Sequence, residues 1–145
     1  MQQDISQIRK AALANEYEQD LTIDCQFRVV NMTNGTFHSR VDINEHHLQQ
    51  DGFINSRIIT IMADKTAGYA GCTTVDGSFQ VLTIEFKINF FKPAFGNALE
   101  CFSRVIRRDR ETIVVASEII DIQNDEKITV AEAMVTLRTI SLIKL

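Results

Sequence analysis

The clearest pattern in the chain lies between residues 78 and 91, where apolar and polar residues alternate. The even positions from Leu82 to Phe90 are apolar and the odd positions from Thr83 to Asn89 are polar. This is the period-two pattern of a strand with one buried face. We therefore expect the even positions to face the core and Thr83 to lie on the opposite, polar face.

Three further strands are predicted after this one, over residues 99–107, 112–122 and 128–140. The only proline, Pro93, separates them from the long strand, because proline interrupts strand pairing. The turns that join the three strands are short, and short turns connect antiparallel neighbours. The C-terminal half of the chain is thus expected to form an antiparallel sheet.

The N-terminal half is predicted to contribute a short helix and a hairpin. Apolar side chains recur at helical spacing over residues 3–17. Asn34-Gly35 is a strong signal for a tight turn, and it lies between candidate strands at residues 21–30 and 36–43. The polar segment 44–54 is expected to be a loop.

Residues 55–70 have the composition of a buried helix. Apolar side chains cover most of the helix circumference, and a helix that is apolar nearly all round lies inside a protein. Asn55 or Ser56 can cap its first turn, and Asp64 is its only acidic residue. Together the elements predict an α+β fold: an antiparallel sheet of about five or six strands around one central buried helix, with a short N-terminal helix.

Length and charge narrow the domain organisation and the partners. A chain of 145 residues is expected to be one domain, with the N-terminal helix in residues 1–19 and the core in residues 20–145. The net charge of -4 argues against nucleic acid as a partner, because a phosphate backbone requires clustered positive charge.

The expected location is cytoplasmic, with no membrane partner. The N-terminus carries charge throughout and lacks the pattern of a signal peptide. The apolar stretch at residues 58–63 is far shorter than the roughly 20 residues that cross a bilayer. Cys25, Cys72 and Cys101 are widely spaced, which indicates free thiols in a reducing compartment. No cysteine and histidine cluster is present in the sequence, so no metal site is expected.

Three stretches resemble the hotdog-fold acyl-CoA thioesterases of the phenylacetyl-CoA thioesterase type, over roughly residues 20–140. The first begins at Gly52, where the family carries histidine-glycine-glycine and then an acid nine residues after the histidine; Asp64 is that acid. The second is the strand over residues 82–93, which ends in asparagine-phenylalanine and a proline. The third, residues 104–113, is similar to an arginine-rich family hairpin.

The sequence departs from the family pattern at several positions. Asn55 stands for the family histidine, and Ser56 and Arg57 stand for the two glycines. Gln49 occupies the position of a frequent family asparagine, and Asp109 replaces the hairpin glycine. These departures leave open whether the catalytic activity of the family is kept.

The resemblance implies a single hotdog domain, a homodimer or a dimer of dimers (a homotetramer), and a site at the dimer interface. Asp64 would act as the general base or the nucleophile, and the backbone N–H of Arg57 would polarise the thioester carbonyl. On one helix these two residues are about 10 Å apart along the axis, which is too far for one chain to complete the site. In the family the helix start comes from one chain and the acid from the other.

Each candidate residue also has a purely structural interpretation. Asp64 could pair with Arg57 or Lys65, or emerge at a helix–helix contact, instead of acting on substrate. Asn55 could be an ordinary helix cap, and Gln49 an ordinary polar loop residue. Thr83 occupies a position where some family members place a hydroxyl that orients water, but on the polar strand face it would reach the site only across the dimer or through a bulge.

Arginines gather in the predicted hairpin at Arg104, Arg107, Arg108 and Arg110. Guanidinium groups suit the pyrophosphate and 3′-phosphate of coenzyme A, which would be part of the substrate and not a separate cofactor. The alternative is a solvated turn, where charges are common. His46 and His47, in the polar loop, are expected to be surface residues.

Three functions fit these observations. The leading hypothesis is a thioesterase that hydrolyses an acyl-CoA to the free acid and CoA. The alternative is a non-catalytic acyl-CoA-binding or regulatory protein on the same fold, suggested by the replaced histidine-glycine-glycine. A hydratase would need a histidine paired with an acid in the site, and His38, His46 and His47 are poorly placed for that role.

Overall fold

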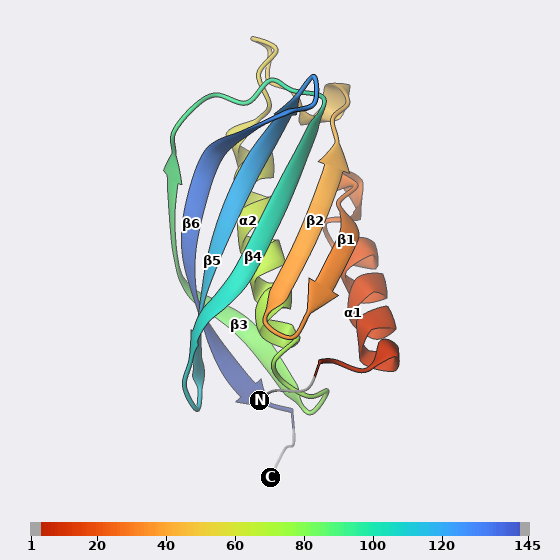
Figure 1. The fold of residues 1–145 in the computed structure, drawn as a ribbon, viewed down its shortest axis with the longest axis vertical. Helices are drawn as coiled ribbons and strands as arrows, with labels where there is room; N and C mark the ends of the chain where they lie inside the picture. Colours follow the sequence, from red (N-terminus) through yellow and green to blue (C-terminus); the bar gives the residue numbers. More distant parts are fainter. Residues whose placement is uncertain (1–3, 143–145) are drawn as a thin grey trace.

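One long helix lies against one face of a six-stranded antiparallel sheet in the computed structural model, which describes residues 4–142 (Figure 1). The strand order is β1-β2-β4-β5-β6-β3, so β1 and β3 form the two edges. The chain contains α1 (Gln7–Gln19), η1 (Ile23–Cys25), β1 (Arg28–Thr33), β2 (Thr36–Asp42), η2 (Glu45–His47), α2 (Ser56–Cys72), β3 (Phe79–Phe90), β4 (Ala98–Arg108), β5 (Thr112–Gln123) and β6 (Glu126–Ser141).

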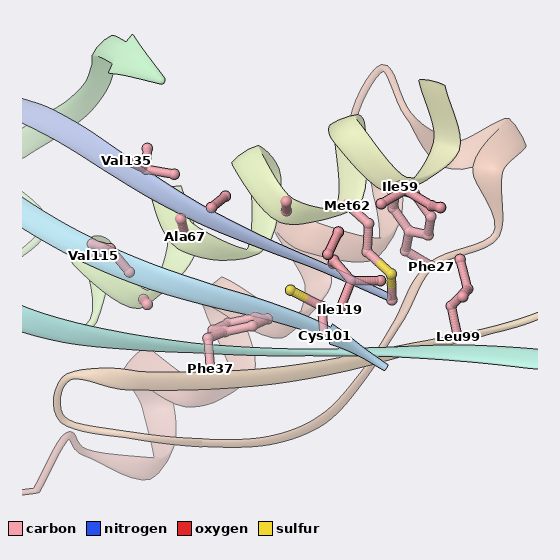
Figure 2. Packing of buried hydrophobic residues seen from close by; sticks show 14 of the residues in the cluster. Phe27, Phe37, Ile59, Met62, Ala67, Leu99, Cys101, Val115, Ile119 and Val135 are labelled. Carbon is pink, nitrogen blue, oxygen red and sulfur yellow. The ribbon is translucent and has the colours of Figure 1, made fainter. Parts of the chain in front are cut away.

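The core fills the space between α2 and the sheet (Figure 2). Ala63, Ala67 and Ala70 are fully buried on α2, and such small side chains let the helix approach the strands closely. Larger side chains such as Met62 and Phe37 fill the remaining volume. None of the helices in residues 4–142 combines the length and apolarity needed to span a bilayer. The predicted α+β fold with one central helix is confirmed.

The first predicted strand is wrong over most of its length. Residues 23–25 form a short 3₁₀ turn, and Gln26 follows with a left-handed φ of 62°. β1 therefore starts only at Arg28 and pairs with β2 through the predicted Asn34-Gly35 turn. The predicted helix at 3–17 starts later, after the Ser6 cap; its first residue, Gln3, lies outside the described residues.

A bulge in β3 makes half of the predicted alternation of buried and exposed side chains wrong. The pairing with β6 shifts between Thr83 and Glu85, and a bulge moves the following side chains to the other face. Phe86 then faces the core as predicted, but Leu82 and Ile84 are 42% and 58% exposed. Thr83 is paired with a core residue of β6 and so shares the inner face.

The segment between β3 and β4 is anchored by a buried carboxylate. Asp121 accepts hydrogen bonds from the N–H groups of Phe95 and Gly96, both at 2.9 Å. The next link is a 2.8 Å hydrogen bond from the Ile54 N–H to the Ala94 carbonyl, which joins this segment to the residues just before α2. The start of α2 is thereby held beside the end of β3.

Alanine substitutions at two separate glycines test this packing. In Gly96→Ala the added Cβ would lie 2.0 Å from the Ile122 carbonyl oxygen, so backbone must move and we expect a loss of about 2–4 kcal/mol in the free energy of unfolding. The control Gly68→Ala meets nothing within 4 Å and lies inside α2, so stability should hold or rise by about 0.5–1 kcal/mol. Urea unfolding measures both; equal stabilities would contradict the described close approach.

Candidate functional site

Asp64 and Thr83 meet within one chain. The Thr83 hydroxyl donates a 2.8 Å hydrogen bond to Asp64 Oδ1, from the bulge in β3 to the middle of α2. Thr83 was expected to reach the site either across the dimer or through a bulge, and in the structure it does so through the bulge. Asp64 is half-buried, and within residues 4–142 it forms no ion pair with Arg57 or Lys65. The structural interpretation of Asp64 as half of such a pair is wrong.

Lys65 faces away from this carboxylate and joins α1 to α2. Its ammonium group donates to Asp20 at 3.0 Å, to the Tyr17 carbonyl and to the Thr22 hydroxyl, and it lies 4.2 Å from the centre of the Tyr17 ring. Burial acts to raise the pKa of Asp20, but hydrogen bonds from Thr22 and Lys65 outweigh it and lower that pKa below its ordinary value. These contacts fix the end of α1 beside Asp64.

The first turn of α2 offers one free backbone donor. Asn55 caps the helix, as one interpretation expected: its side-chain oxygen accepts from the Arg57 N–H at 2.9 Å, and its carbonyl accepts from the Ile58 N–H at 3.0 Å. The Arg57 N–H, expected to polarise a carbonyl, is thus already engaged. The Ser56 N–H has no partner within the described part of the chain, as is usual for the first helical residue.

Ser56 and Asp64 cannot meet on the same helix. Eight residues of α2 separate them, about 12 Å along the axis. Because of this distance, Ser56 and Asp64 line two separate hollows. One, of about 420 Å³, is lined by Ser56, Gln49 and Phe90, and the other, of about 510 Å³, by Asp64 and Thr83. Within one chain the Ser56 N–H and the Asp64 carboxylate therefore do not share a hollow.

The predicted phosphate-binding arginines lie at the β4–β5 hairpin, beside the C-terminal end of α2. Arg108 donates to the carbonyl of Thr74, just after α2. Arg107 forms an exposed ion pair with Asp109 at 3.2 Å, and Arg110 is exposed. Because α2 has 17 residues, these arginines lie about 25 Å from the start of the helix in the same chain. Their role in binding CoA stays a prediction.

His47 is buried, contrary to the expectation of a surface position. Its Nδ1 accepts from the Asn44 N–H at 3.0 Å, which leaves the Nε2 hydrogen to bond the Cys25 carbonyl at 2.8 Å. Consecutive residues of a 3₁₀ turn point in different directions, so His46 is exposed while its neighbour faces the protein. His47 is a structural link between two loops.

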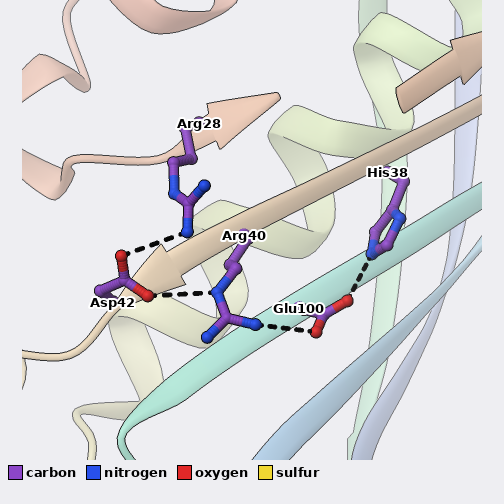
Figure 3. Close-up of polar contacts among 5 residues, drawn as sticks. All are labelled: Arg28, His38, Arg40, Asp42 and Glu100. Carbon is purple, nitrogen blue, oxygen red and sulfur yellow. Dashed lines mark hydrogen bonds and ion pairs between the residues drawn. The ribbon is translucent and has the colours of Figure 1, made fainter. Parts of the chain in front are cut away.

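One histidine–acid pair was not expected from the sequence (Figure 3). His38 Nε2 lies 2.7 Å from Glu100, which also pairs with Arg40 at 3.1 Å. Arg40 and Arg28 in turn bind Asp42. His38, Arg40 and Asp42 alternate along β2 with the buried residues that face α2, so they lie on the outer face of the sheet. The pair is thus separated by the sheet from Asp64 and from the start of α2.

Comparison with known proteins identifies relatives of this arrangement. A family model described as "Thioesterase superfamily" matches residues 54–128. The candidate esterase SSO2140 of Saccharolobus solfataricus is 31% identical over 94 residues, which are 65% of this chain and 66% of that relative.

Solved structures show the same fold. A thioesterase family protein from Silicibacter pomeroyi superposes with a TM-score of 0.87 at 22% identity, covering 92% of this chain and 98% of the other. A hypothetical thioesterase from Streptococcus pneumoniae, solved with coenzyme A, superposes with a TM-score of 0.70 at 17% identity, covering 79% and 86%.

Proposed function

The chain belongs to the thioesterase superfamily, and we propose that it hydrolyses an acyl-CoA thioester to the free acid and coenzyme A. The observation that carries the proposal is the Asp64 carboxylate, held by Thr83 at the mouth of a groove in a family scaffold. The similar protein from Streptococcus pneumoniae has coenzyme A bound, which supports CoA as the thiol. The expected likeness to the phenylacetyl-CoA type and the cytoplasmic location stay predictions.

Asp64 supplies the base. One carboxylate oxygen accepts the Thr83 hydrogen bond, which leaves the other oxygen to accept a proton from water as that water attacks the thioester carbon. The carbon–sulfur bond then breaks, and the proton passes to the departing CoA thiolate. Direct attack by the carboxylate, through an anhydride that water later opens, uses the same geometry.

Ser56 supplies the donor for the developing oxyanion. Its N–H is free at the N-terminus of α2, where the helix dipole favours negative charge. This places the role one residue earlier than the Arg57 N–H expected from the sequence, because Asn55 already occupies that group. The backbone performs this task, so the loss of the family glycines does not remove it.

The exposed edge of β3 favours a dimer. The strand has 12 residues and, among residues 4–142, a neighbour on one side only. Ile84, Phe90 and Phe91 are each about half exposed. A long apolar edge is a liability unless another chain covers it. A second copy paired through β3 would cover both edges at once.

The charges on β3 favour one register for this pairing. In an antiparallel pair centred on Phe86, Glu85 of each chain lies opposite Lys87 of the other, twice by symmetry. Both side chains lie on the outer face, and neither forms an ion pair within residues 4–142. The same register sets the Thr83 end of each strand beside the Phe90 end of its partner, so the Asp64 hollow of one chain meets the Ser56 hollow of the other.

A non-catalytic acyl-CoA-binding protein is the second candidate. The Asn55-Ser56-Arg57 replacement of the family histidine-glycine-glycine is the observation that favours it. It predicts the same ligand and the same dimer but no release of thiol.

Asp64→Asn tests the catalytic assignment. The amide keeps the shape of the side chain but cannot accept the proton, so we expect kcat/KM to fall about 10²- to 10⁴-fold. Release of free thiol from a panel of acyl-CoAs measures it, with the exposed Asp24→Asn as the matched control. Full activity of Asp64→Asn would refute the mechanism, and tight binding without turnover by the wild type would establish the binding protein instead.

Exchanging the charges of Glu85 and Lys87 tests the register in which the two β3 strands pair. Glu85→Lys or Lys87→Glu alone places like charges opposite each other at two symmetric positions, which should weaken dimerisation about tenfold or more. The double variant restores opposite charges and should recover the wild-type dissociation constant in sedimentation experiments. Single variants that dimerise normally, or a double variant that stays weakened, would exclude pairing centred on Phe86.

A further inference from the structure

A groove runs along α2 from Asp64 toward the C-terminal end of that helix. It has a volume of about 510 Å³ and is lined by residues of α1, α2 and β3. Asp64, Gly68 and Cys72 share one face of α2 because they are four residues apart. A Cβ on Gly68 would meet none of the described residues within 4 Å. The glycine therefore keeps the groove open beyond Asp64.

Part of the lining of the groove suits an acyl chain, while Glu16 and Gln80 add polar side chains to it. Leu13 of α1 and Val81 of β3 are apolar and pack with the core. Burial raises the pKa of the Cys72 thiol to about 11, with the Glu16 carboxylate adding to the effect, so this thiol is neutral. Burial and Glu16 also raise the pKa of Tyr69, so its phenol stays protonated.

Arg9, in the first turn of α1, lies at the far end of the groove, and some of its N–H groups have no hydrogen-bond partner within residues 4–142. Its Nε is buried and has no hydrogen-bond partner among the described residues. Its Nη2 reaches the Cys72 carbonyl only at 3.4 Å. The other groove cation, Lys65, is committed to Asp20. Glu16 is seven residues from Arg9, about 10 Å along α1, and forms no ion pair with it within residues 4–142.

The spacing along α2 between Asp64 and Cys72, whose carbonyl oxygen Arg9 contacts, indicates a substrate class. From Asp64 to Cys72 is about 12 Å along α2, roughly the extended length of a nine- or ten-carbon chain. Resting on the thioesterase function above, we propose that the groove binds medium-length ω-carboxyacyl thioesters. The thioester carbonyl lies at Asp64 and the terminal carboxylate binds Arg9. A planar guanidinium with unused N–H groups is well matched to a carboxylate.

Two thioesters of equal chain length test this assignment: decanoyl-CoA and sebacoyl-CoA, its ω-carboxy counterpart. Arg9→Met should lower kcat/KM for sebacoyl-CoA about 10- to 100-fold and leave decanoyl-CoA within about twofold. Lys10→Met is the matched control, because Lys10 pairs with Asp4 outside the groove, and it should change neither rate.

Equal losses on both thioesters would place Arg9 against the phosphates of CoA and overturn the assignment, as would no loss on either. Calorimetric binding of both thioesters to Asp64→Asn, with and without Arg9→Met, separates this inference from the proposed function. If the wild type hydrolyses neither compound but the Arg9-dependent preference for sebacoyl-CoA persists in binding, only the thioesterase function fails. If decanoyl-CoA is hydrolysed without any dependence on Arg9, only the ω-carboxyacyl assignment fails.

Discussion

The packing of α2 against the sheet is the constraint on which the rest of the structure depends. Its buried alanines hold the helix close to the strands, and the helix is then a rigid rod of 17 residues with fixed rise. That rise separates the Ser56 N–H from the Asp64 carboxylate by about 12 Å. In the proposed mechanism the two groups therefore act on the same thioester from different chains, and the proposal of a dimer rests on this helix geometry.

The sequence predicted the elements that depend on long periodic patterns. The buried helix and the antiparallel strands from residue 98 onward follow directly from hydrophobic periodicity, and Asp64 stood out as the one acid in an apolar helix. The resemblance to a known family added the site residues, among them Thr83. Whether Arg107, Arg108 and Arg110 bind phosphate could not be decided, because exposed charges in a hairpin look the same in either role.

The features that the sequence did not reveal depend on tertiary contacts. The apolar and polar residues of β3 alternate without interruption in the sequence, so nothing there indicates the bulge that turns Thr83 toward Asp64. The alternation of side chains along one strand does not specify how that strand pairs with its neighbour. The burial of His47 depends on carbonyl and amide groups of two distant loops. The sequence also does not reveal that the Arg57 N–H is engaged, or that the Arg9 Nε has no partner among residues 4–142, although both bear directly on how a thioester would lie.

Complementation between two inactive variants tests the shared site most directly. Asp64→Asn removes the base. Ser56→Pro removes the N–H at a position where proline fits the helix start and the extended Asn55 before it. Co-expressed in equal amounts, the two chains should form heterodimers with one intact site each, giving about a quarter of wild-type thiol release. Activity no higher than that of either variant alone would contradict a site built from two chains.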